Sequence, residues 1–161
     1  MEAVCVIRPE RGSRVTGTVR FLQESRDASV SISVDLKGFA RDGEFGFHIH
    51  RYGNTTGGCA SMCEHFDANR NKTHGGPDDA NRHLGDLGNI RVRNRACKRT
   101  IDDRMLSLFG LAGKRSIVGR GVVVHEKRDD LGRGGNAESL VTGNAGKRVA
   151  CGVIALATDL Y

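Results

Sequence analysis

Histidine is concentrated in one stretch of this 161-residue chain. Five of the six histidines fall between residues 48 and 86, and the sixth is His125. Imidazole is the commonest metal ligand among side chains. The crowding therefore predicts a metal centre, with seven candidate ligands: His48, His50, His65, His74, His83, Asp86 and His125.

The first two histidines lie in a segment with the periodicity of a strand. In residues 45–50 the apolar residues Phe45, Phe47 and Ile49 alternate with His48 and His50. On a strand the two histidines share one face, with Cβ atoms roughly 6.5 to 7 Å apart, so both rings can reach one ion. The segment 65–86 is rich in Asn, Gly, Asp and Pro, which predicts a loop folded around an ion.

The number of candidate ligands indicates two metals. Six imidazoles and a carboxylate are too many for one tetrahedral zinc. Nitrogens alone suit copper, whereas three nitrogens and an Asp oxygen suit a closed zinc site. If each metal takes four ligands, seven side chains leave one to be shared, and His65 is central in the stretch. Any one of these histidines alone could be a surface residue, so the prediction depends on the whole set.

The secondary structure around these residues is predicted to consist of strands. Eight β-like runs occur, and in the third Val30, Ile32, Val34 and Leu36 share one face. The runs are 3–7, 15–22, 29–36, 45–50, 88–93, 101–108, 116–125 and 149–157. With 22 glycines and no long helical periodicity, the chain is predicted to be an all-β sandwich or barrel. The connections 51–87 and 126–148 are too long for hairpin turns, which favours functional loops.

Composition limits the class of protein. A chain of this length predicts one domain, residues 1–161, and the start of the sequence lacks a signal peptide pattern. No apolar run approaches membrane-spanning length, so we expect a soluble intracellular protein. The net charge is +6, but aromatic residues make up only 5% and Trp is absent, which argues against nucleic-acid binding. The basic cluster of Arg91, Arg93, Arg95, Lys98 and Arg99 is interpreted as the exposed face of a strand running into a loop.

Five cysteines allow ten single pairings, among which the sequence alone does not choose. Cys5 has apolar neighbours and is expected to behave as a small core hydrophobe. Cys97 lies among charged residues and is expected to be a free thiol.

Seven short motifs, spread over nearly the whole chain, resemble Cu,Zn superoxide dismutases of the eukaryotic intracellular type. They occupy residues 46–50, 74–77, 83–89, 124–127, 129–132, 143–146 and 150–154. The resemblance implies a flattened eight-stranded Greek-key barrel, an immunoglobulin-like sandwich, and does not distinguish a cellular from a viral member. It also implies a copper site of His48, His50, His65 and His125 and a zinc site of His65, His74, His83 and Asp86. His65 would be the bridging imidazolate, as the ligand count indicates.

The resemblance assigns roles to four further residues. It implies a disulfide between Cys59 and Cys151, and places Arg148 at the floor of an anion channel. Asp129 matches the carboxylate that joins a copper-binding to a zinc-binding histidine, here His48 and His74. A homodimer is implied through positions 52, 53, 118, 119 and 156, together with a cytoplasmic location and the possibility of a copper chaperone as partner.

The activity implied is disproportionation of superoxide to oxygen and hydrogen peroxide at the copper, with His65 exchanging a proton. One alternative is a non-catalytic metal-binding relative, either chaperone-like or a decoy. Retention of Arg148 and of every copper ligand favours the enzyme. Another alternative, a basic nucleic-acid module with structural zinc at Cys59 and Cys63, leaves the histidines unexplained.

Several residues depart from the family pattern. Arg51 stands where an acid is usual, and Ala137 and Val141 replace a charged pair in the loop 126–148, which puts the strength of substrate steering in doubt. Cys63 and Glu64 replace residues that are usually Gly and Pro, and one extra residue lies between His65 and His74. We therefore expect the zinc loop to be shaped differently here.

Overall fold

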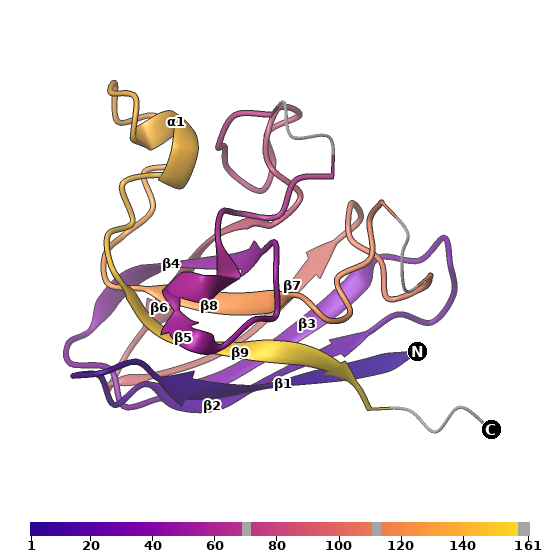
Figure 1. The fold of residues 1–161 in the computed structure, drawn as a ribbon, viewed down its shortest axis with the longest axis horizontal. Helices are drawn as coiled ribbons and strands as arrows, with labels where there is room; N and C mark the ends of the chain where they lie inside the picture. Colours follow the sequence, from indigo (N-terminus) through magenta and orange to yellow (C-terminus); the bar gives the residue numbers. More distant parts are fainter. Residues whose placement is uncertain (69–71, 111–113, 158–161) are drawn as a thin grey trace.

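The structure is a computed structural model that describes residues 1–68, 72–110 and 114–157. The described residues form nine strands and two very short helices (Figure 1). The strands are β1 Glu2–Pro9, β2 Thr16–Leu22, β3 Val30–Lys37, β4 Gly43–His50, β5 Thr56–Cys59, β6 Asp86–Val92, β7 Ala96–Asp103, β8 Gly121–His125 and β9 Arg148–Leu156. The helices are the 3-10 turn η1 Ala60–Met62 and α1 Ser139–Thr142. The all-β prediction is therefore confirmed.

Eight of these strands form one antiparallel sheet in the order β6-β4-β8-β9-β1-β2-β3-β7. Its two edge strands, β6 and β7, are consecutive in the chain. A tight turn joins them through Asn94 and Arg95, both at positive φ, and an isolated bridge pairs Arg93 with Ala96. The sheet therefore curls into a nearly closed barrel, as expected.

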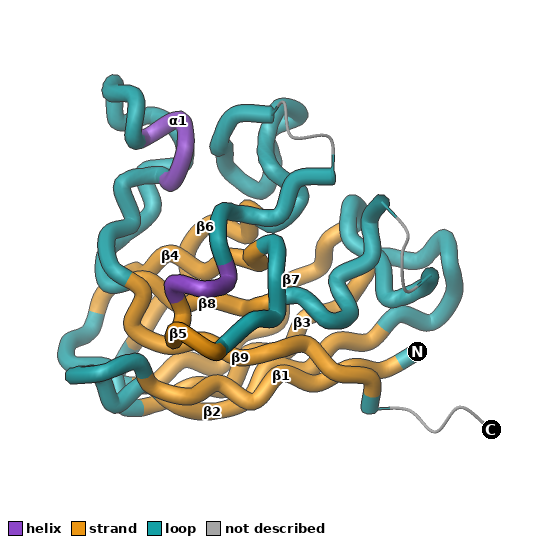
Figure 2. The backbone as a smooth tube through the Cα atoms, viewed as in Figure 1, coloured by secondary structure: helices purple, strands orange, loops and turns teal. Residues whose placement is uncertain are grey.

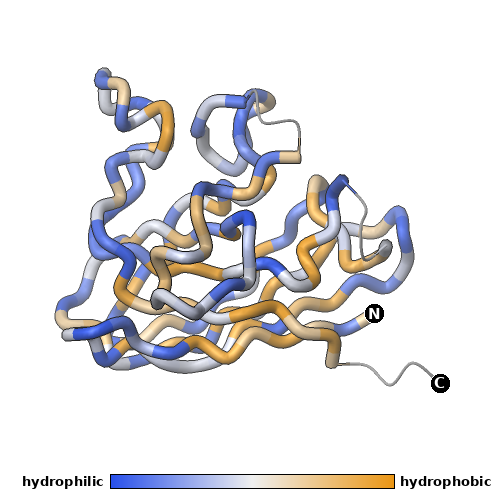
Figure 3. Tube along the Cα trace, viewed as in Figure 1, coloured by the Kyte–Doolittle hydropathy of each residue, from blue (hydrophilic) through white to orange (hydrophobic). Residues whose placement is uncertain are grey.

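Alternating side chains fill the barrel. In β3 the residues Val30, Ile32, Val34 and Leu36 are all buried, as their alternation predicts. Cys5 is buried in the same core, as predicted, and burial raises the pKa of its thiol to about 12. Figure 3 shows hydrophobic residues along the strands and mostly hydrophilic ones in the loops above them.

Both long loops extend from the same side of the barrel (Figure 2). The first loop, between β4 and β6, carries β5 and η1. It packs on the outer face of the sheet, where Met62 lies in a small cluster with Val123 and the two cysteines of a disulfide. The second loop carries α1. The two loops meet where the N–H of His74 donates to the carbonyl oxygen of Leu140 at 2.8 Å. This outer surface, rather than the barrel interior, is where the histidines gather.

Two predicted strands differ most from the structure. The sixth predicted run was 101–108, but the corresponding strand, β7, runs from Ala96 to Asp103, because the Asp103 carboxylate accepts the N–H groups of Met105 and Leu106 and turns the chain. Lys98 and Arg99 consequently lie within β7 and not in a loop, although both are exposed. The predicted run 116–125 corresponds to β8, which begins only at Gly121, after a turn with Gly119 at φ 81°.

Cys97 has a free thiol, as predicted, but it is buried. Within the described residues no helix has the length and apolar composition needed to cross a membrane.

Candidate metal centre

The predicted ligands come together at the ends of two neighbouring strands and in the loops that follow them. His48 and His50 lie at the end of β4, paired with β8, which ends at His125. His65 follows η1, and an isolated bridge pairs it with His50. His74 and His83 belong to the loop before β6, and Asp86 is the first residue of β6. The structure arranges the seven side chains in two groups, each with ligand atoms within 4.8 Å of one another. The nitrogen group is His48, His50, His65 and His125; the mixed group is His65, His74, His83 and Asp86.

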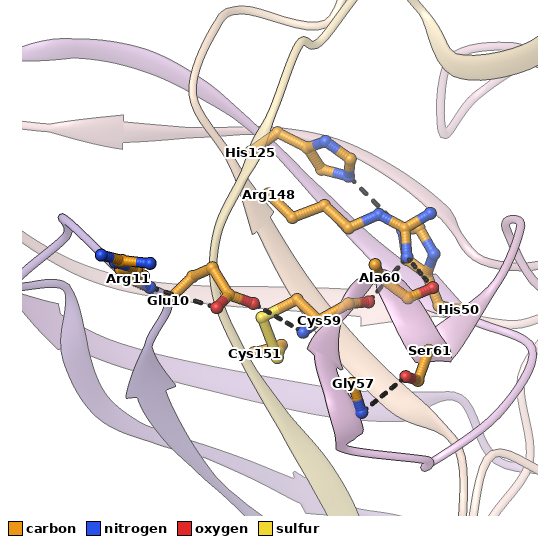
Figure 4. Close-up of a disulfide and its surroundings, with 10 residues drawn as sticks. All are labelled: Glu10, Arg11, His50, Gly57, Cys59, Ala60, Ser61, His125, Arg148 and Cys151. Carbon is orange, nitrogen blue, oxygen red and sulfur yellow. Dashed lines mark hydrogen bonds between the residues drawn. A yellow bond between two sulfur atoms is a disulfide. The ribbon is translucent and has the colours of Figure 1, made fainter.

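Two rings of the nitrogen group face each other with unprotonated nitrogens. His50 donates from Nδ1 to the carbonyl oxygen of Cys63 at 2.8 Å, and His125 donates from Nδ1 to that of Gly146 at 3.2 Å. A carbonyl only accepts, so each neutral ring keeps a lone pair on Nε2. These two Nε2 atoms lie 3.4 Å apart (Figure 4). Burial, together with the neighbouring positive groups, holds the pKa of both histidines well below the usual range, so both rings are neutral.

The other two rings of the nitrogen group present lone pairs without partners. His48 donates from Nε2 to Asp129 at 2.7 Å, which leaves the lone pair on Nδ1. Burial lowers the pKa of His65 to about 3, and its Nδ1 lies 2.7 Å from an Asp86 oxygen, which leaves the lone pair on Nε2. Within the described part of the chain, neither His48 Nδ1 nor His65 Nε2 has a hydrogen-bond partner. Buried unpaired acceptors are costly, and four that converge fit a metal cation that prefers nitrogen ligands.

The mixed group surrounds one carboxylate. The Asp86 oxygen Oδ1 lies 2.7 Å from His65 Nδ1, 3.0 Å from His74 Nδ1 and 3.2 Å from His83 Nδ1. The far nitrogens of the last two rings are anchored, since His83 Nε2 lies 3.0 Å from the carbonyl oxygen of Lys72 and His74 Nε2 lies 2.7 Å from Asp129. The three histidine nitrogens and the Asp86 oxygen of this group fit a closed zinc site.

His74 holds a proton where the metal would bind. Burial would lower the pKa of His74, but its hydrogen bonds to Asp129 and Asp86 outweigh this effect and raise the pKa to about 9. At neutral pH the metal-free ring is therefore an imidazolium that donates from Nε2 to Asp129 and forms an ion pair with Asp86 through Nδ1. A metal at Nδ1 would displace one of these protons.

Asp129 links the two groups from outside. Its two oxygens accept from His48 and His74, both at 2.7 Å, and its own backbone is held by Asn89, whose side chain contacts the Asp129 N–H at 2.7 Å and the carbonyl oxygen at 2.9 Å. Gly143 passes so close that a Cβ there would lie 1.9 Å from an Asp129 oxygen. Asn89 and Gly143 lie in two of the motifs that carry the family resemblance, but their roles could not be predicted from the sequence because they depend on contacts across two loops.

Arg148 borders an open cleft beside the nitrogen group. It donates from Nη1 to the carbonyl oxygens of Cys59, at 2.7 Å, and Ala60, at 3.3 Å, and from Nη2 to that of Cys63. Figure 4 shows its guanidinium beside the rings of His50 and His125. The cleft has a volume of about 520 Å³, and its described lining consists of His50, Glu64, His65, His125, Lys127, Glu138, Val141, Thr142, Asn144, Gly146, Lys147 and Arg148.

The disulfide between Cys59 and Cys151 is present, with the two Cα atoms 5.7 Å apart, which confirms this pairing. It joins the first loop to β9. The Cys59 N–H also donates to Glu10 at 2.7 Å. Cys63, the neighbouring cysteine, is free and exposed.

The departures at positions 51 and 64 belong together, because Arg51 and Glu64 form an ion pair. This pairing was not predicted, although the opposite charges of the two residues, each next to a predicted ligand, were a usable signal. Part of the stretch with the extra residue, 69–71, lies outside the described residues.

Comparison with known proteins decides the family. Residues 15–154 match the family model described as copper/zinc superoxide dismutase. The chain belongs to this family. It is 50% identical over 158 residues to a Cu-Zn superoxide dismutase of Cordyceps militaris, an alignment that covers 98% of this chain and 99% of the relative. It is 51% identical over 148 residues to one of Paramecium bursaria Chlorella virus 1, which covers 91% of this chain and 76% of the relative.

A solved structure described as the clock protein EA4 superposes with a TM-score of 0.86 and 41% identity. The match covers 96% of this chain and 93% of that one. The superoxide dismutase family is characterised by copper and zinc, and the nitrogen and mixed groups match those two metals in donor type. The resemblance seen in the motifs is thus confirmed at the level of family and fold.

Proposed function

We propose that this chain is a superoxide dismutase that converts two superoxide anions and two protons into oxygen and hydrogen peroxide. The observation that carries the proposal is the convergence of four imidazole lone pairs beside a cleft bordered by Arg148. The nitrogen group would hold copper and the mixed group zinc, with His65 common to both. Bound copper would supply the one-electron oxidation and reduction, whereas zinc has no redox chemistry.

The chain's own residues have three tasks in this proposal. Arg148, fixed by three carbonyl oxygens, attracts and orients a small anion in the cleft. His65 is in place to hold a proton at Nε2 and to release it toward the product. Asp129 fixes the ring orientations of His48 and His74, a task typical of carboxylates behind metal ligands.

The open cleft favours an enzyme over a non-catalytic metal-binding relative. A metal-storage or decoy protein needs neither a free approach to the nitrogen group nor a cation that borders it. The test is superoxide decay followed by pulse radiolysis with purified, copper- and zinc-loaded protein. We expect rapid decay, first order in protein. Protein that binds both metals but leaves the decay at the rate of buffer would contradict the proposal.

We further propose a homodimer that uses the surface around Tyr52. That side chain is 47% exposed, and Val6 on β1, in a neighbouring groove, is 51% exposed. Gly53 packs against the turn at Gly119, where a Cβ on Gly53 would lie 2.4 Å from the Gly119 carbonyl oxygen. Val118 and Leu156 complete the set of positions that the resemblance assigns to the interface. Light scattering of the oxidised, metal-loaded protein that finds only monomer would contradict this proposal.

A cytoplasmic location is proposed from the thiols. Cys63 is free and exposed, and Cys5 and Cys97 are free and buried. Free thiols persist in reducing compartments. There a copper chaperone could load the site. Fractionation of cells that produce the protein, with recovery in a membrane or secreted fraction, would contradict the location.

A further inference from the structure

An ion pair joins the residues next to His50 and His65, two members of the nitrogen group. Arg51 follows His50 directly, and Glu64 precedes His65. An isolated bridge pairs the two histidines, and the Arg51 N–H donates to the carbonyl oxygen of Glu64 at 2.9 Å. The side chains of Arg51 and Glu64 continue this pairing as a salt bridge.

The two partners differ in how firmly they are held. The Arg51 side chain is 13% exposed and that of Glu64 is 56% exposed. The Arg51 carbonyl oxygen accepts from Arg120 at 2.7 Å, and the Arg120 guanidinium lies 3.5 Å from the centre of the Phe66 ring. The Arg51 side chain is therefore mostly buried on a backbone that Arg120 holds, whereas the exposed Glu64 side chain could swing into solvent if the pair were broken.

Glu64 lines the cleft that leads to the nitrogen group. Three cations, Lys127, Lys147 and Arg148, also line it, and Glu64 and Glu138 are its acids. Glu138 is engaged by the Thr142 hydroxyl, which donates to it at 2.7 Å. Burial lowers the pKa of Arg148, and electrostatic interactions with Cys63 and Glu64 act in the opposite direction. Glu64 and Arg148 also line the same cleft, so the carboxylate is close enough to interact with the guanidinium. A free carboxylate here would repel an anion and compete for the guanidinium that should bind it.

We propose that Arg51 is a positioning residue that holds the Glu64 carboxylate in an ion pair and so keeps the cleft attractive to anions. The pair thereby determines how fast superoxide reaches the nitrogen group. This inference rests on the proposed copper site. It also explains why an acid can stand next to His65 in this chain: Arg51, which follows His50, pairs with that acid, Glu64.

The pair should respond asymmetrically to substitution. Arg51→Gln leaves an exposed carboxylate in the cleft, which costs little stability but slows the approach of anions. Glu64→Gln removes the acid but leaves Arg51 near Arg120 without its partner, which lowers stability rather than rate. The double variant Arg51→Gln/Glu64→Gln should regain the rate that the first variant loses.

The experiment measures two quantities on copper- and zinc-loaded proteins over a range of ionic strength: the superoxide rate constant by pulse radiolysis, and the affinity of azide for the Cu(II) protein by optical titration. The control is Arg93→Gln, which makes the same change in net charge at an exposed residue outside the described lining of the cleft. At low salt we expect Arg51→Gln to lower both quantities by about twofold to fivefold, the scale of one unit charge near a surface site. We expect the control and the double variant to stay close to wild type.

Equal losses from Arg51→Gln with and without Glu64→Gln would overturn the inference, since Arg51 would then act through its own charge alone. A loss no larger than that of Arg93→Gln would overturn it as well. If Arg51→Gln does not retain copper, the exchanged pair Arg51→Glu/Glu64→Arg decides, because it puts the cation on the cleft side and should match or exceed the wild-type rate; a slower rate would refute the inference. Wild-type protein that binds copper but neither binds azide nor removes superoxide would instead refute the proposed function.

Discussion

Arg148 donates a hydrogen bond from Nη1 to the carbonyl oxygen of Cys59 at 2.7 Å, so the residue that borders the cleft is held by a residue of the disulfide. The same disulfide ties the first loop to β9, on which Arg148 itself lies. We therefore expect the redox state of the two cysteines to affect the position of the guanidinium.

Reduction of this disulfide should lower stability and activity together. The bridge closes a loop across 92 residues, for which the chain-entropy model gives an upper value of about 4.6 kcal/mol. We expect Cys59→Ser to lower the melting temperature and to weaken dimerisation, and to reduce the superoxide rate at full copper occupancy because Arg148 loses a fixed acceptor. Cys63→Ser is the control, since that thiol is free. A Cys59→Ser protein with wild-type rate and wild-type salt dependence would show that the carbonyl contact does not position Arg148.

Gly143 should be intolerant of a side chain for a steric reason. A Cβ there would lie 1.9 Å from Asp129 Oδ1 and 2.4 Å from His74 Nε2, and the residue has a φ of 67°. Gly143→Ala should therefore displace the Asp129 carboxylate and lower zinc affinity and activity by about 10- to 100-fold, the usual effect of losing such a partner.

Gly135→Ala separates this clash from backbone strain. Gly135 belongs to the same loop and has a φ of 74°, but no described atom lies within 4 Å of the position that a Cβ would occupy there. We expect this variant to lose a little stability and to keep its metals, as measured by competition with a chromophoric chelator. Equal losses of zinc in the two variants would mean that strain, and not the contact with Asp129, explains the glycine.

The metal-free protein should lose stability between pH 7 and 8 through His74. Its pKa is about 9 in the fold and about 6.5 when unfolded, so the stabilisation is complete below pH 6.5 and is lost as the pH rises toward 9. The pKa values of Asp86 and Asp129 are lowered, so both carboxylates titrate in acid. The lowered pKa values of His50, His65 and His125 have the opposite effect to that of His74, but mainly near pH 6.5, where these residues titrate in the unfolded chain. We expect a loss on the order of 1 kcal/mol in urea titrations with chelator present. His74→Gln should remove the slope, and a wild-type curve as flat as that of the variant would refute the assignment.

Charge reversal at Arg148 should change the salt dependence of the reaction. Wild-type activity should fall as ionic strength rises, because salt screens the attraction of superoxide beyond roughly 8 Å at physiological concentration. Arg148→Glu should be slow at low salt and decline less, or recover, as salt screens the new repulsion. The rates are compared by pulse radiolysis at matched copper occupancy. Parallel curves would assign the steering to the basic surface as a whole.

Local patterns in the sequence were sufficient for the strands that carry the site. The alternation in 45–50 placed His48 and His50 on one strand face, and the alternation in 29–36 identified a core face. The end of β7, which the predicted run 101–108 overshot, was missed because the Asp103 side chain ends this strand through contacts with later residues. The choice of Cys59 and Cys151 among ten pairings came from family resemblance, since spacing carries no information about which cysteines meet in space.

Contacts between loops were beyond the sequence analysis. The seven candidate ligands could be counted, but the lone pairs that converge depend on which ring nitrogen meets a carbonyl or carboxylate, as in His50 with Cys63 and His48 with Asp129. The pairing of Arg51 with Glu64 likewise depends on the bridge between the segments next to them. These relationships join residues far apart in the chain, for which no periodicity exists.

We propose that His65 is shared by a copper site and a zinc site. The most direct measurement is X-ray diffraction from crystals of the metal-loaded protein at the copper and zinc absorption edges. We predict two anomalous peaks: a copper peak among His48, His50, His65 and His125, and a zinc peak among His65, His74, His83 and Asp86. A single peak, both metals in one group, or a His65 ring in contact with only one of them would contradict the account.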